Sequence, residues 1–160
     1  MEQWMAQIAR IVLMFYCSLA PSAMRIAIDT NILIAALTQP RGNSARIVRA
    51  WREGRLEVVA SAATVREAEL VLGGGWLARL TSPAAVRALL DDLRTRTVRV
   101  EAPPITGPRL KDAGDLRLAE AAVAGGASYI VTTDREFLSQ RGYGSTEFVT
   151  PGEFLRLWQE

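Results

Sequence analysis

The chain has 160 residues, 49% of them hydrophobic, which is enough for one hydrophobic core and too short for two ordinary domains. Its formal charge is +2, and all basic residues except Lys111 are arginines; this favours phosphate binding, although the base composition of a genome would explain it equally well. Histidine is absent from the sequence, which excludes Ser-His and Cys-His catalysis and imidazole–metal sites.

The first 23 residues differ from the rest. The run IARIVLMFYCSLAPSA places one arginine before a stretch of apolar and small residues, the outline of a short signal peptide, and it is too short for a comfortable membrane span. We favour the alternative that Met24 is the natural start, because the regular pattern begins directly after it. We therefore expect residues 1–23 to be an extension outside the fold and residues 24–160 to form one domain. The single cysteine, Cys17, fits a reducing, cytoplasmic location without stable membrane association.

Strand-like and helix-like segments alternate from Met24 onward. Strands are expected at residues 24–29, 56–60, 97–100, 128–134 and 146–150. Helices are expected at residues 31–37, 44–54, 62–72, 82–96, 115–124 and 151–158. Ser44 and Ser82 are expected to cap their helices, and Pro83 marks the first turn of one of them.

Alternation of this kind with short connections predicts an α/β domain with a mostly parallel sheet. Ligands of such sheets bind beyond the carboxyl ends of the strands. Asp29 ends the first expected strand and Asp134 follows the fourth, so both carboxylates should project from the same edge.

Two further acids can reach that edge. Asp115 is expected to open a helix, where a carboxylate is favoured whether or not it has another role. On the helix over residues 62–72, Glu67 has mostly apolar or small neighbours one turn away, whereas Glu69 has Arg66 one turn back. We therefore expect Glu67 to face inward and Glu69 to be a solvated partner of Arg66.

Several carboxylates at one buried edge cannot all stay ionised without a compensating cation. With no histidine, zinc fits poorly, whereas Mg²⁺ or Mn²⁺ prefers oxygen ligands and phosphate. Such an ion polarises a phosphoryl oxygen and activates water, which indicates phosphodiester hydrolysis. Each acid also has a plain structural explanation as a cap, a surface residue or an ion-pair partner; only their joint placement argues for a site.

The sequence at this point resembles PIN-domain ribonucleases, specifically the VapC-like toxin half of VapBC-type toxin–antitoxin pairs. The resemblance is carried by IDTNILIAAL, ASAATVREAELVL and KDAGDLRLAEAAVAGGASYIVTTDREFL, and it runs from about residue 24 to about residue 158. It implies a three-layer domain, with a twisted sheet of four to five strands between helices, and an acid cluster that binds Mg²⁺ or Mn²⁺.

Residue by residue, Asp29, Glu67, Asp115 and Asp134 fall on the acidic positions of that family. The resemblance implies that Asp29 and Asp115 hold the ion directly or through water, that Asp134 completes the metal pocket, and that Glu67 orients the attacking water.

Other positions match supporting residues of the family. Asn31 matches a polar residue that helps to hold the first aspartate, and Thr132 or Thr133 matches the hydroxyl before the last one. Relatives often have a denser acidic string where this chain has Asp112-Ala-Gly-Asp115, so Asp112 is a further candidate.

The resulting hypothesis is a metal-dependent endoribonuclease toxin with an RNA substrate, a cognate antitoxin and a homodimeric state. Arginines that flank the acids are candidates for phosphate contacts: Arg41, Arg66, Arg117 and Arg135. Trp158 could cover apolar surface in a dimer or under an antitoxin, whereas core packing is expected for Trp51. One alternative is a non-catalytic RNA- or protein-binding module. Another is a haloacid-dehalogenase-like phosphatase, which needs an aspartate where Asn31 stands.

Overall fold

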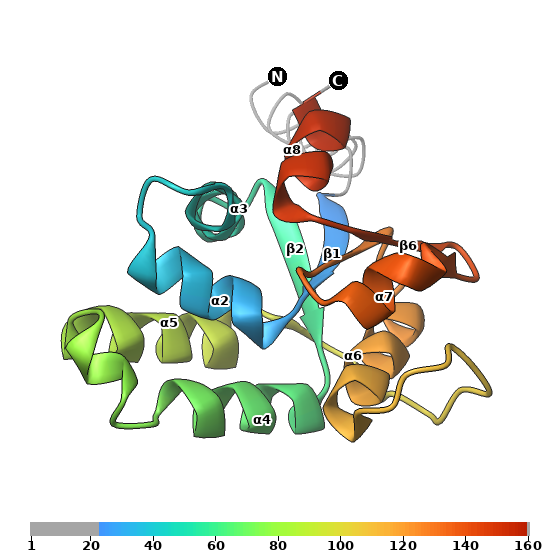
Figure 1. Cartoon of the computed structure of the whole chain (residues 1–160), viewed down its shortest axis with the longest axis horizontal. Coiled ribbons are helices and arrows are strands. Elements are labelled where there is room, and N and C mark those ends of the chain that lie inside the picture. The colour runs from blue at the N-terminus through green and yellow to red at the C-terminus, as the bar shows by residue number, and fades with distance from the viewer. Residues whose placement is uncertain (1–22, 160) are drawn as a thin grey trace, which may run out of the picture.

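The structure is a computed structural model that describes residues 23–159. Within this range the chain forms a six-stranded sheet in the order β3-β2-β1-β4-β6-β5, with helices on both faces (Figure 1). Neighbouring strands are parallel except for β5, which is antiparallel to β6. The predicted α/β class with a mostly parallel sheet is confirmed, with one strand more than expected. The strands are β1 (Met24–Ile28), β2 (Leu56–Ala60), β3 (Val98–Arg99), β4 (Tyr129–Val131), β5 (Gly142–Tyr143) and β6 (Thr146–Val149).

All six predicted helices are present, with small shifts at their ends. They are α2 (Thr30–Thr38), α3 (Asn43–Arg52), α4 (Ala62–Leu72), α5 (Pro83–Thr95), α6 (Ala113–Ala124) and α8 (Pro151–Gln159). Two helices were not predicted: α7 (Arg135–Gln140) and the short 3-10 helix η1 (Leu77–Arg79).

Of the two serine N-caps predicted from the sequence, one is confirmed and one is wrong. Ser82 accepts a hydrogen bond from the Ala85 amide, as predicted for the start of α5. The predicted cap at Ser44 is wrong, because α3 begins at Asn43 with Gly42 in the N-cap position. Ser44 lies inside the first turn, where it is buried, so its hydroxyl does not stand before the free amides of the helix.

The expected N-terminal extension comprises residues 1–23, of which residues 1–22 lie outside the described residues. Among residues 23–159, no helix combines the length and the apolar character needed to cross a membrane.

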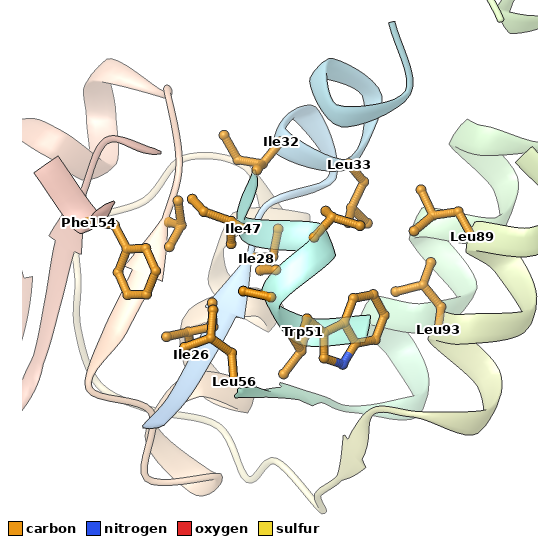
Figure 2. Packing of buried hydrophobic residues seen from close by; sticks show 14 of the residues in the cluster. Ile26, Ile28, Ile32, Leu33, Ile47, Trp51, Leu56, Leu89, Leu93 and Phe154 are labelled. Carbon is orange, nitrogen blue, oxygen red and sulfur yellow. The ribbon is translucent and has the colours of Figure 1, made fainter. Parts of the chain in front are cut away.

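Alternating residues of the strands supply two hydrophobic clusters, one on each face of the sheet. Ile26 and Ile28 of β1 join the cluster under α2, α3, α5 and α8 (Figure 2), whereas Ala27 joins the cluster under α6 and α7. Because both faces are covered, the strands are apolar nearly throughout, as expected of a parallel sheet. Trp51 is 3% exposed and Phe154 is fully buried, so Trp51 is a core residue, as the sequence favoured.

The strand register determines which loops meet at the carboxyl edge. Ile28 of β1 pairs with Val131 of β4, and Ile26 pairs with Val58 of β2 on the other side. The strand order reverses between β1 and β4, because β2 and β3 extend the sheet in one direction and β6 and β5 in the other. A crevice for a ligand is expected at this switch point.

Candidate functional site

Asp29 and Thr132 meet at the switch point, each directly after the last residue of its strand. The hydroxyl of Thr132 donates a hydrogen bond to Asp29 Oδ2 at 2.7 Å. Thr132 is fully buried and Asp29 is 7% exposed. The Thr132 hydroxyl oxygen also accepts from the Asp134 amide at 2.9 Å, so one side chain links the loops after both strands. Thr133 is exposed, so of the two threonines that the sequence left as candidates, Thr132 is the one that contacts Asp29.

The other carboxylate oxygen of Asp29 caps the N-terminus of α2. Oδ1 accepts a hydrogen bond from the Asn31 amide at 3.1 Å, which is the usual role of an N-cap aspartate. The side chain of Asn31 is exposed, so the hydrogen bond that holds Asp29 comes from the backbone N–H of Asn31 and not from its side-chain carboxamide. Each oxygen of a carboxylate has two acceptor positions, which leaves Asp29 able to bind a further group.

The start of α6 differs from the prediction. The helix begins at Ala113, with Asp112 as the N-cap that accepts from the Gly114 amide at 2.7 Å and the Asp115 amide at 3.3 Å. Asp115 therefore lies in the first turn and does not open the helix. Because Asp112 satisfies the free amides, the Asp115 carboxylate is left for the pocket that it lines together with Asp29. The structure thus assigns Asp112 a capping role.

Asp134 caps the helix that the sequence did not predict. Its Oδ1 accepts from the Glu136 amide at 2.6 Å and the Phe137 amide at 3.4 Å, which starts α7. Asp134 is half-buried and lies close enough to Asp29 and Asp115 for its charge to raise the pKa of both.

Glu67 and Glu69 of α4 point to different neighbours. Glu67 lines the pocket of Asp29 and Asp115 and its Oε2 accepts from Arg117 Nη2 of α6 at 3.2 Å. Glu69 pairs with Arg94 of α5 at 2.7 Å, so the expected pair with Arg66 is wrong. The reason is tertiary: α5 packs beside α4 and offers a nearer cation than the same helix does.

Burial and the negative charges of neighbouring acids disfavour the charged forms of Asp29 and Asp115. Burial raises the pKa of Asp29; hydrogen bonds from Thr132 and Asn31 lower this pKa, and the charges of Asp134 and Glu67 raise it. Burial also raises the pKa of Asp115 to about 6, and the negative charges of Asp29 and Asp134 add to the effect. A bound cation would relieve this repulsion.

The carboxylate oxygens of the pocket suit a hard divalent ion, but few of them could bind it directly. Among residues 23–159, no three acidic, histidine or cysteine side chains close on one point as a ready-made metal site. Mg²⁺ commonly takes only one or two carboxylates and keeps several waters. The cavity is about 40 Å³, room for about one water at liquid density, and Asp29 and Asp115 supply carboxylates to it. The residues therefore fit an ion held by two carboxylates and water.

The arginines named from the sequence lie in different places. Arg66 and Arg117 line a groove between α4 and α6 together with Glu67 and Leu70, and Arg135 follows Asp134 at the start of α7. Arg41 lies beyond the far end of α2, a nine-residue helix about 14 Å long, which separates it from Asp29. The four are exposed.

Two residues of the site were not identified from the sequence. Gly114 lines the pocket beside Asp115, and Thr64 lines it from α4. Gly114 stood before the helix expected over residues 115–124, so the sequence pattern carried no signal for its place in the site. The signal for Thr64 was its spacing from Ser61, with which it forms a capping box.

Comparison with known proteins bears on the fold and the family. A family model described as PIN domain matches residues 25–136, well over half of the chain. Among solved structures, the fold is similar to a chain in the crystal structure of VapBC2 from Rickettsia felis bound to a DNA fragment from their promoter, with a TM-score of 0.50 and 14% sequence identity over 79% of this chain and 98% of that chain. At this identity the similarity concerns the fold alone. No curated protein matches the sequence significantly.

Proposed function

The chain belongs to the PIN-domain family, and we propose that it is a metal-dependent endoribonuclease that hydrolyses RNA phosphodiester bonds. PIN domains are generally nucleases. The observation that carries the proposal is the buried hydrogen bond between Thr132 and Asp29, which orients a carboxylate at the switch point of the sheet, in a pocket that Glu67 and Asp115 also line.

In this proposal, Asp29 and Asp115 hold Mg²⁺ or Mn²⁺, and Asp134 adds negative charge beside them. The ion supplies Lewis acidity toward a phosphoryl oxygen and toward water. Thr132 and the Asn31 amide orient Asp29 before any ligand binds. Glu67 lies at the pocket wall, where it would orient the attacking water and accept its proton as the ester P–O bond breaks.

The groove beside Glu67 supports RNA as the substrate. Arg66 and Arg117 line it with apolar Leu70, so it offers cations for phosphates and an apolar surface for a base or sugar. Arg135 is a third candidate for a phosphate contact. The phosphatase alternative is set aside, because the family model that matches is that of a PIN domain and Asn31 stands where a second aspartate is needed.

We further propose that the protein is the toxin of a type II toxin–antitoxin pair. The similar structure from Rickettsia felis is that of a VapBC complex. The segment 70–80 exposes large apolar side chains, with Leu70 at 74% and Leu80 at 58%, which is typical of a surface that binds a partner. Leu157 of α8 is 46% exposed and is a candidate for the contact between two copies in a homodimer.

Cleavage of a mixed single-stranded RNA by the purified protein tests the activity. Wild type should cleave with Mg²⁺ or Mn²⁺ and should stop in excess chelator, and Asp29→Asn should lower the rate at least about 100-fold, as for other groups that act on the transition state. Asp91→Asn is the matched control, because Asp91 is 72% exposed on α5. Cleavage that persists in chelator, or equal rates for wild type and Asp29→Asn, would refute the mechanism; binding of RNA without cleavage would indicate the non-catalytic alternative.

A further inference from the structure

Glu67 is held by contacts from another helix. Its side chain lies between the acid pocket and the groove of α4 and α6, since it lines both. The side chain is 37% exposed, and a glutamate with this freedom on a helix surface would sample several rotamers. The contact that restricts its carboxylate comes from Arg117 of α6, at 3.2 Å from Oε2.

Gly114, one turn before Arg117, supplies the second contact. A Cβ at this position would lie 2.8 Å from both Cδ and Oε2 of Glu67, and closer still to Oε1. Gly114 is buried and sits in the first turn of α6. The carboxylate of Glu67 therefore rests against the backbone of α6 at the one place where a side chain is missing.

Local backbone geometry does not explain the glycine. The backbone φ of Gly114 is not among the positive values that favour glycine, and alanine is the better residue in a helix. Because the backbone accepts any residue here, the physical reason for a glycine is the space that Glu67 occupies.

We infer that Gly114 and Arg117 are positioning residues that together hold the Glu67 carboxylate at the wall of the acid pocket. Gly114 provides the room and Arg117 provides the opposite charge. Asp115, between them in the chain, lines the same pocket. The first turns of α6 therefore contribute the Asp115 carboxylate to the pocket and also fix the position of the Glu67 carboxylate. The effect on catalysis rests on the proposed function of Glu67, whereas the effect on its position does not.

Gly114→Ala tests the inference, with Gly152→Ala as its matched control. Gly152 occupies the same second position of its helix, α8, and a Cβ there would meet only Asn43 Nδ2 at 3.4 Å, an ordinary contact. We expect Gly114→Ala to fold normally and to lower kcat for RNA cleavage about 10–100-fold with little change in KM, because a shift of about 1 Å in a reacting group has this effect. Gly152→Ala should cleave at the wild-type rate.

Three further measurements separate positioning from a general defect. In the Glu67→Gln background, Gly114→Ala should have no additional effect on the residual rate, because the two changes act through one carboxylate. A crystal structure of Gly114→Ala should show the Glu67 carboxylate displaced from α6 and its contact with Arg117 lost. Arg117→Gln should lower kcat; a change in KM alone would overturn the role of Arg117.

The outcomes distinguish the inference from the proposed function. If wild type cleaves and Gly114→Ala cleaves equally well, or if Glu67 keeps its position in the variant structure, the inference is wrong. If wild type does not cleave at all, the proposed function fails, and the variant structure still decides whether Gly114 positions Glu67.

Discussion

Replacing Asp115 with asparagine should stabilise the metal-free protein at neutral pH, although it removes a proposed metal ligand. Burial raises the pKa of this carboxyl from 3.8 to about 6, and the charges of Asp29 and Asp134 contribute. The folded protein therefore holds the proton more tightly than the unfolded chain. The stability that this proton contributes is fully present below pH 3.8 and is lost as the pH rises through about 6.

The size of the effect follows from the pKa. At about 1.4 kcal/mol for each pH unit, the rise from 3.8 to about 6 corresponds to about 3 kcal/mol. Asp115 is only partly buried, so solvent screening reduces this free energy to about 1–2 kcal/mol. We expect Asp115→Asn to exceed wild type in free energy of unfolding by this amount at about pH 7.5, and the difference to vanish near pH 4.

Urea unfolding at a series of pH values, in chelator, measures this difference. Asp91→Asn, at an exposed site, should stay within about 0.5 kcal/mol of wild type at each pH. Mg²⁺ should then reverse the order, because an ion at 100 times its Kd stabilises the protein that binds it by about 2.7 kcal/mol. A difference between wild type and Asp115→Asn that is constant with pH, or a less stable Asp115→Asn in chelator at neutral pH, would refute the reasoning.

Three further substitutions test other parts of the site. Thr132→Val should abolish cleavage and lower the free energy of unfolding by about 2–3 kcal/mol, because it leaves Oδ2 of the buried Asp29 carboxylate without its donor. Thr132→Ser should retain most of the activity and of the stability, as measured by RNA cleavage and urea unfolding. Glu67→Gln should lower kcat about 100-fold, whereas Glu69→Gln, which faces Arg94, should not; equal losses would remove Glu67 from the mechanism. Arg66→Gln should weaken RNA binding in filter assays and reduce the slope of affinity against salt by about 1, and an unchanged slope would exclude a phosphate contact.

The elements that sequence patterns predicted well are those whose residues decide them locally. The helix at α5 has Ser82 and Pro83 at its start, and its cap is the one expected. The parallel strands appear as short apolar runs between turn residues, and β1 and β2 lie where these runs predicted them. Hydrophobic pattern and turn chemistry act over a few residues, so a single sequence is enough to read them.

The elements that were missed are short and depend on their surroundings. Helix α7 has six residues, Arg135–Gln140, and a helix of this length is not stable without packing. It is held by its cap at Asp134 and by Phe137, which is fully buried against Phe148 with ring centroids 5.1 Å apart. The other missed element, strand β5, pairs only two of its residues with β6. Neither has enough internal pattern to be distinguished from a loop.

The sequence by itself determined the order and type of the longer elements, the acids at the strand ends, and the absence of imidazole and intrachain disulfide chemistry, because all of these are local or compositional. Tertiary structure alone decided which polar groups meet. Asp29 and Thr132 are 103 residues apart, and they are neighbours only because Ile28 pairs with Val131. The same holds for Glu67 and Arg117, 50 residues apart. Strand register and helix packing set these contacts, and a shift of one residue in register would turn the side chains of that strand to the opposite face of the sheet.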